Sequence, residues 1–94
     1  MRSVLRTNNF KKDLRREARG RYRKILDKEL WEVVDIIAND GLLSLSYHDH
    51  ALIGQWEGCR ECHLAFDLVL IYRLVGQNTL ILVRLGTHSE ALGL

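Results

Sequence analysis

The sequence has no long apolar run and little cysteine. Its longest strongly apolar stretch, Leu68 to Tyr72, is far shorter than the roughly 18 residues that a membrane-spanning helix requires. Residues 1–17 also contain no apolar run of the length of a signal peptide. These absences predict a cytoplasmic protein without membrane contact, in which Cys59 and Cys62 would remain reduced.

The composition is that of an ordinary globular domain. The 94 residues are 47% hydrophobic and 28% charged and show no internal repeat, so we expect one domain that spans residues 1–94. The net charge is only +2, but it is unevenly distributed. Residues 1–40 carry 11 Lys/Arg against 7 Asp/Glu, whereas residues 41–94 carry 3 against 5, together with all 4 histidines. The first half therefore suits phosphate contacts, and the second half holds groups that titrate near neutral pH.

One strand and two helices are predicted in the first half. Ser3–Arg6 has the pattern of a short strand, and Thr7 or Asn8 suits the N-cap of a following helix. Apolar residues recur in that helix at four-residue spacing, which predicts a buried face of Phe10, Leu14 and Ala18. Gly20 would end or bend the helix. A second helix is expected from Arg21 to Asn39, with a buried stripe of Leu26, Leu30, Val33, Val34 and Ile37.

Three further strands are expected after a loop over residues 42–56. They span residues 58–64, 68–74 and 80–85, with a turn at Gly76-Gln77-Asn78 between the last two. The element order is β-α-α-β-β-β. It predicts an α+β fold, in which a small, antiparallel-rich four-stranded sheet carries two N-terminal helices on one face.

This topology would gather titratable side chains at one end of the sheet. His63 and Asp67 flank the tight connection between two strands, and His88 follows the last strand. Because neighbouring strands run antiparallel, the end of the last strand returns to the start of the strand before it. We therefore expect His63, Asp67 and His88 to lie close together, with His50 in the preceding loop.

Two other kinds of site compete for residues in this half of the chain. Residues 59–63 read CRECH, the C-x-x-C-H pattern of c-type haem attachment, but that chemistry belongs to exported proteins. A zinc site could combine Cys59, Cys62 and His63 with either His48 or His50. Residues three apart in a strand point to opposite faces, so the two cysteines are poorly placed to share a metal. We therefore expect neither a metal nor any other cofactor.

The second half of the chain resembles a known family. Residues 47–74, YHDHALIGQWEGCRECHLAFDLVLIYRL, and residues 84–93, RLGTHSEALG, are similar to the YafQ branch of the RelE superfamily of toxin–antitoxin ribonucleases. That branch combines a D-H-x-L-x-G-x-W loop, a G-x-R-x-x-H-x-x-x-D segment before an I-Y strand, and a terminal R-x-G-T-H. These motifs occur here in that order, whereas the first half of the chain matches only in layout.

The resemblance implies an activity and its partners. Members of the family cut mRNA on the ribosome without a metal, so this chain is expected to be an endoribonuclease that inhibits translation. The expected partners are the ribosome, mRNA and an antitoxin of the RelB/DinJ type with a ribbon-helix-helix segment, and operator DNA only through the antitoxin complex. Two alternatives remain. One is a catalytically weakened homologue that acts mainly in operon repression, and the other is a zinc-dependent nucleic-acid-binding module.

The resemblance also assigns active-site positions, which are His50, His63, Asp67, Arg84 and His88. Leu68 and Leu92 stand where the family prototype has aromatic residues that could stack on bases, so the codon preference is open.

RNA carries its own nucleophile, the 2′-OH, so cleavage requires a base, an acid and cations near the phosphate. We assign the acid to His88 and the base to His50 or His63 with Asp67, and these roles could be exchanged. Arg84 and Arg60 are expected to hold the phosphate. Trp56 and Leu92 complete the predicted substrate contacts. The basic stripe of the first helix is expected to bind ribosomal RNA through Lys11, Lys12, Arg15, Arg16 and Arg19.

Overall fold

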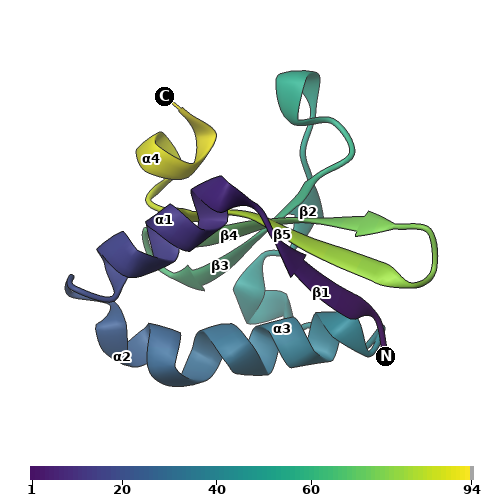
Figure 1. Ribbon diagram of the computed structural model, residues 1–94, viewed down its shortest axis with the longest axis horizontal. Coiled ribbons are helices and arrows are strands. Elements are labelled where there is room, and N and C mark those ends of the chain that lie inside the picture. Colours follow the sequence, from purple (N-terminus) through teal and green to yellow (C-terminus); the bar gives the residue numbers. More distant parts are fainter. Residues whose placement is uncertain (94) are drawn as a thin grey trace.

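A mixed sheet of five strands runs through the molecule (Figure 1). The computed structural model describes residues 1–93. Its strands are β1 (Ser3–Arg6), β2 (His50–Ala51), β3 (Arg60–Ala65), β4 (Leu68–Val75) and β5 (Thr79–Gly86). They lie in the order β1-β5-β4-β3-β2, and β1 is parallel to β5 whereas the other pairs are antiparallel.

The α+β class and four of these strands were predicted, but the sheet differs from the expected one. The prediction of a four-stranded sheet is wrong, because β2 adds a fifth strand at the outer edge of β3. Two residues are too few to show an alternating pattern, so β2 exists only through its pairing with β3. The parallel pairing of β1 with β5 also makes the sheet mixed, and a sequence pattern does not specify strand direction.

Two N-terminal helical segments follow β1. The helix α1 (Asn8–Glu17) is capped by Thr7, whose side-chain oxygen accepts a hydrogen bond from the backbone N–H of Phe10 at 2.9 Å. The segments α2 (Arg23–Ile25), the π-helical turn η1 (Leu26–Leu30) and α3 (Trp31–Ala38) then follow one another without a break. Together they form one long helix close to the predicted range.

The main core lies between these helices and one face of the sheet. All five residues of the predicted stripe of the long helix are buried there: Leu26, Leu30, Val33, Val34 and Ile37. The buried face of α1 was predicted less well. Phe10 is fully buried and Leu14 partly, but Ala18 is exposed, and the carboxylates Asp13 and Glu17 are buried in its place.

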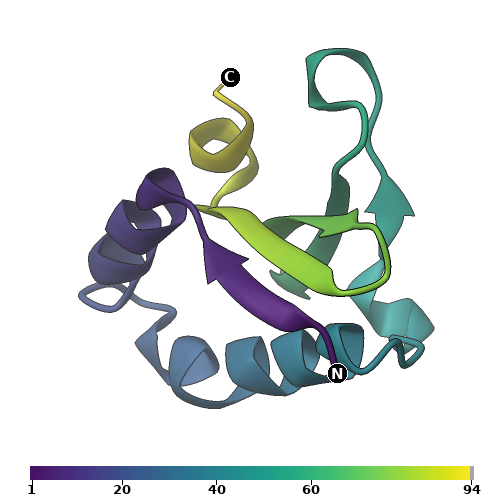
Figure 2. The same ribbon diagram turned by 45° about the vertical axis from the view of Figure 1, so that its right-hand side comes forward.

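The other face of the sheet carries a short helix that was not predicted, α4 (His88–Leu92) (Figures 1 and 2). Its start is a capping box, in which Thr87 accepts a hydrogen bond from the Glu90 amide and the Glu90 side chain accepts one from the Thr87 amide. The loop before β3 holds two 3₁₀ turns, η2 (Leu45–Tyr47) and η3 (Gly54–Trp56). Val69, Ile71 and Ala91 form a second, smaller apolar cluster between α4 and the sheet.

None of the helices described in residues 1–93 is long and apolar enough to span a membrane.

Candidate active site

The first residues of the site lie on β3, whose side chains point alternately to the two faces of the sheet. Cys62 and Leu64 point into the core beneath the helices, so Glu61 and His63 point to the opposite face. Glu61 is almost completely buried, with 3% of its surface exposed. A buried carboxylate without partners would be strongly destabilising, so its neighbours must be hydrogen-bond donors.

The predicted convergence of His63, Asp67 and His88 is confirmed. Val69, near the start of β4, pairs with Gly86 at the end of β5, so the chain enters α4 directly beside the turn that carries Asp67. Asp67 Oδ1 accepts hydrogen bonds from the His88 backbone N–H at 3.2 Å and from His88 Nδ1 at 3.1 Å. The rings of His63 and His88 lie 5.0 Å apart between centroids.

Glu61 connects the histidines and was not predicted as a site residue. Its Oε1 lies 3.1 Å from Nε2 of His88 and 3.1 Å from Nε2 of His63. It also lies 4.0 Å from Nε2 of His50, which is paired with Glu61 across β2 and β3. The two ring nitrogens of His88 therefore each face a carboxylate oxygen, and an imidazolium that donates from both nitrogens satisfies both contacts.

The ring of His50 is oriented by the backbone. Its Nδ1 lies 2.7 Å from the carbonyl oxygen of His48, and a carbonyl oxygen can only accept, so Nδ1 carries the hydrogen. When the His50 ring is neutral, its other nitrogen, Nε2, carries no hydrogen, and the lone pair of Nε2 lies on the side that faces Glu61. His48 itself has the left-handed backbone conformation, with φ of 48°, which is uncommon for a residue other than glycine.

Two groups of the cluster have shifted pKa values. Burial is the main cause that lowers the pKa of His63, and nearby His88, His48 and His50 add to this effect while Glu61 opposes it. The backbone N–H and the ring of His88 lower the pKa of Asp67, and the charge of Arg21 contributes further. His63 is therefore held neutral, and Asp67 is held ionised at neutral pH.

These side chains line an open groove of about 1110 Å³. It is lined by Glu29, Ser46, Tyr47, His48, His50, His63, Leu64, Ala65, Phe66, Asp67 and His88. All 4 histidines of the sequence are in this set, and no Lys or Arg is among these lining residues. Imidazole is thus the only basic group that the lining itself offers.

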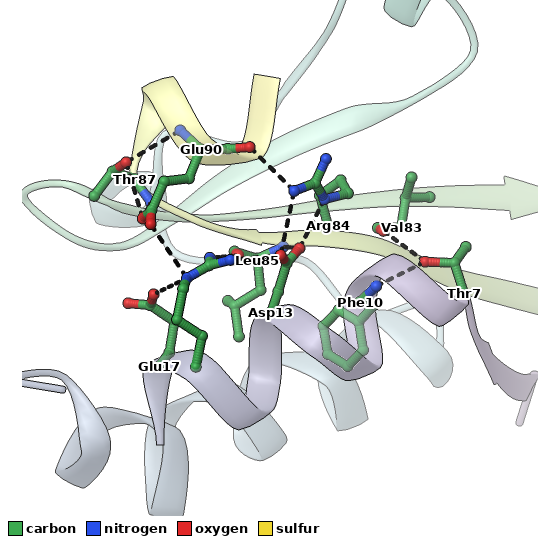
Figure 3. Close-up of polar contacts among 10 residues, drawn as sticks. Thr7, Phe10, Asp13, Glu17, Val83, Arg84, Leu85, Thr87 and Glu90 are labelled. Atoms are coloured by element: carbon green, nitrogen blue, oxygen red, sulfur yellow. Dashed lines mark hydrogen bonds and ion pairs between the residues drawn. The ribbon is translucent and has the colours of Figure 1, made fainter. Parts of the chain in front are cut away.

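Arg84 belongs to a second polar network (Figure 3), and it is not among the residues that line the groove. Its Nε donates to Asp13 Oδ2 at 2.7 Å, and its Nη2 donates to Asp13 Oδ1 at 3.2 Å and to the Glu90 carbonyl at 3.1 Å. Asp13 is 2% exposed and also accepts from the Leu85 amide at 3.0 Å. The network therefore ties α1 to the end of β5 and to the helix that carries His88.

Arg16, which was predicted to belong to the ribosome-binding stripe, is also part of this network, and its contact with the ribosome stays a prediction. It donates to Asp13 and Glu17 at 2.9 Å each and to the Leu85 carbonyl at 3.0 Å, and it lies 3.2 Å from Glu90. A Cβ atom on Gly86 would lie 2.7 Å from its Nη2, so a larger residue at this position would force the guanidinium to shift from these contacts. Arg16 is thus engaged in internal ion pairs although its side chain is 40% exposed, and the other members of the stripe, Lys11, Lys12, Arg15 and Arg19, are exposed as well.

Three other predicted substrate residues lie elsewhere. Arg60 points to the helix-covered face, where it pairs with Asp49 at 2.9 Å, so the structure does not bring it to the histidines. Trp56 and Leu92 pack against the second apolar cluster and are not among the residues that line the groove. Their substrate contacts stay predictions.

The sites that would have used both cysteines are not formed. Cys62 lies in the core beneath the helices, and burial raises the pKa of its thiol to about 12. Cys59 packs into the cluster on the opposite face. One metal or one haem cannot reach both sulfurs, so these zinc and haem hypotheses are wrong. A different set, Glu61, His63 and His88, offers three ligand atoms within 4.8 Å of one another.

Comparison with known proteins identifies the family. The family model described as the bacterial toxin of type II toxin–antitoxin systems, YafQ, matches residues 2–93. The chain belongs to the YafQ toxin family. The mRNA interferase toxin YafQ of Escherichia coli K12 is 36% identical over 70 residues, which cover 74% of this chain and 75% of that protein.

Solved structures of bacterial toxins share the fold. The metal-bound toxin from Helicobacter pylori is 40% identical, with a TM-score of 0.79 over 96% of this chain and 98% of that one. The toxin chain of the E. coli DinJ–YafQ complex is 30% identical, with a TM-score of 0.76 over 95% and 96%.

Two residues of the site were not predicted, although their positions in the sequence indicated them. Glu61 stands two positions before His63, so strand alternation places both on one face. Phe66 lies in the turn between β3 and β4, directly before the predicted site residue Asp67. The burial of Glu61 had no signal in the sequence, because two of its contacts, His50 in β2 and His88 in α4, come from other elements.

Proposed function

We propose that this YafQ-family protein is a ribosome-dependent mRNA endoribonuclease that inhibits translation. One observation carries the proposal: His88 is held between the carboxylates of Asp67 and Glu61, beside the ring of His63 and in a groove shared with His50. The mRNA interferase activity named for the E. coli relative agrees with this arrangement. The DinJ–YafQ complex likewise supports a DinJ-like antitoxin as the partner of this chain.

The cleavage step follows from the hydrogen-bonding roles of the histidines. Nε2 of His50 takes the proton of the 2′-OH, and the 2′-oxygen attacks the adjacent phosphorus. His88 gives a proton to the 5′-oxygen as the P–O5′ bond breaks. The products are a 2′,3′-cyclic phosphate and a 5′-OH, and proton exchange with water restores both histidines.

The other groups position this pair. Asp67 contacts His88 and not His50 or His63, so we move it from the base to the acid. His63, kept neutral by burial, contacts Glu61 and lies between the rings of His50 and His88. Arg84 keeps its proposed phosphate role, with its Nε and Nη2 oriented by Asp13 and the Glu90 carbonyl.

The test is cleavage of mRNA on programmed ribosomes by the purified protein, with analysis of the product ends. Cyclic phosphate and 5′-OH ends are expected, whereas 3′-OH and 5′-phosphate ends would contradict attack by the 2′-OH. A protein that represses transcription together with its antitoxin, but cleaves no mRNA, would favour the catalytically weakened homologue.

A transition-metal ion is expected to inhibit, not support, this reaction. Glu61, His63 and His88 could hold an ion such as Cu²⁺ or Zn²⁺, which agrees with the metal-bound relative from H. pylori. The ion would bind the ring nitrogens of His63 and His88, and His88 could then no longer donate a proton. We expect added Zn²⁺ to lower the cleavage rate. A zinc-selective chelator should leave the cleavage rate of untreated enzyme unchanged. Free Mg²⁺ is held constant in both measurements so that the ribosome stays intact. Loss of activity with the chelator, restored by Zn²⁺, would show instead that the enzyme requires a metal.

The exposed basic residues of α1 are proposed to bind ribosomal RNA. We expect the double variant Arg15→Glu and Arg19→Glu to weaken ribosome binding and to lower the slope of log affinity against log salt by about 1 per phosphate contact removed. The double variant Lys24→Glu and Lys28→Glu makes the same charge change on the exposed side of the long helix and serves as control. Both are compared by ribosome pelleting at several salt concentrations. If the α1 variant keeps its ribosome affinity but no longer binds the antitoxin, this surface serves the antitoxin.

A further inference from the structure

A single aromatic side chain stands fully exposed on the wall of the groove. Phe66 is 97% exposed and lines the groove next to Asp67. Isolated exposed apolar residues are common and need no explanation by themselves. Here, however, the residue lies in the two-residue turn between β3 and β4, three positions after His63 and directly before the carboxylate that holds His88.

The turn is held at both ends, so the backbone that carries the ring is well fixed. The strands β3 and β4 are paired up to Ala65 and Leu68. Asp67 is fixed by its two hydrogen bonds to His88. A phenylalanine side chain has only two rotatable bonds, so binding a flat partner to it costs little conformational entropy.

The chemistry of the groove selects the kind of partner. The four imidazoles that line the groove can donate hydrogen bonds to the phosphate oxygens of a ligand, and apolar side chains of the lining lie beside them. A segment of single-stranded RNA supplies phosphates and also bases with flat faces, which stack on aromatic side chains. A nucleobase next to the scissile phosphate therefore matches both properties of this wall.

The other aromatic and aliphatic residues nearby are less available for this role. Tyr47, which also lines the groove, is partly buried against the main core. Trp56 packs into the second cluster. Leu68 is 0% exposed beneath the helices, and Leu92 is aliphatic and packs beside Ala91.

We propose that Phe66 stacks on a base of the mRNA beside the cleaved bond and thereby contributes to substrate affinity and nucleotide preference. This inference rests on the proposed endoribonuclease function. Because the ring makes its contact with substrate and not with the reacting atoms, its loss should act on KM more than on kcat. One base–aromatic stack corresponds to a change of about 5- to 150-fold in binding.

Kinetics on programmed ribosomes test the proposal. Phe66→Leu keeps an apolar side chain but removes the ring, and we expect it to lower kcat/KM by about 5- to 150-fold, mainly through KM. Phe66→Trp keeps a flat ring and should restore most of the loss. Ile53→Ala changes another exposed apolar residue, 88% exposed and outside the groove lining, and serves as the control. Thermal unfolding should be the same for all, since Phe66 makes no buried contact.

A second measurement detects the stack directly. An mRNA with a 2′-O-methyl group at the cleavage position cannot be cut, and 2-aminopurine placed next to it loses fluorescence when it stacks. We expect quenching with the wild type and with Phe66→Trp, and none with Phe66→Leu. Equal kcat/KM and equal quenching for Phe66→Leu would overturn stacking while leaving mRNA cleavage established. Loss of antitoxin binding alone in that variant would assign Phe66 to the protein partner, and absence of cleavage by the wild type would overturn the proposed function itself.

Discussion

Replacing His88 by alanine is expected to lower the rate of mRNA cleavage by about 10²- to 10⁴-fold, the usual contribution of a general acid. The side chain is 40% exposed and lies at the start of α4, so its removal leaves no closed cavity and the protein should remain folded. Single-turnover cleavage on programmed ribosomes measures the rate, and thermal unfolding checks the fold. The exposed neighbour Ser89, changed to alanine, is the matched control.

A modified substrate separates the acid from the base. When sulfur replaces the 5′-oxygen at the cleaved bond, the leaving thiolate needs no proton, so an enzyme without its general acid should regain most of its rate. We expect this rescue for His88→Ala and not for His50→Ala. Rescue of His50→Ala alone would exchange the two roles, and wild-type rates for His88→Ala with ordinary mRNA would remove His88 from the chemistry.

The second large effect concerns stability. We expect Asp13→Asn to lower the free energy of unfolding by about 2–4 kcal/mol. Removal of one partner of a buried ion pair typically costs about 3–5 kcal/mol, and the lower figure allows for the partial exposure of Arg84 and Arg16. Asp27→Asn, in which an exposed carboxylate of the long helix is neutralised, is the control. Urea unfolding of both variants at pH 7 measures the difference.

The effect should depend on pH in a defined direction. Burial alone would raise the pKa of Asp13, but hydrogen bonds from Arg84, the Leu85 amide and Arg16 outweigh it and lower the pKa below its ordinary value of 3.8. The folded protein therefore holds this proton less tightly than the unfolded chain, and the stabilisation is complete above the unfolded value and lost as the pH falls through the folded one. The wild type and Asp13→Asn should thus differ fully at pH 7, and the difference should shrink in the range below the ordinary value of 3.8. A difference that stays constant down to this range would show that the charge of Asp13 is not what stabilises the fold.

The sequence by itself determined those parts of the protein that repeat with a period. Residues spaced as in a helix predicted the buried stripe from Leu26 to Ile37, and the apolar runs predicted β4 and β5 within two residues. The convergence of His63, Asp67 and His88 also followed from the strand order, because antiparallel neighbours return the chain to the same end of the sheet. Local pattern and chain connectivity were sufficient for these features.

Only the tertiary structure decided which charged groups are buried and what they contact. Glu61 and Asp13 have the sequence context of exposed residues, and both are buried because elements distant in the chain supply their donors. The ion pairs of Arg16 were not predicted for the same reason, because β5 and α4 provide its partners. The tertiary structure likewise decided that Asp67 contacts His88, at 3.1 Å between Oδ1 and Nδ1, and not His50 or His63. Burial of a charge depends on the sum of all contacts around it, and that sum exists only once the sheet and its helices are packed.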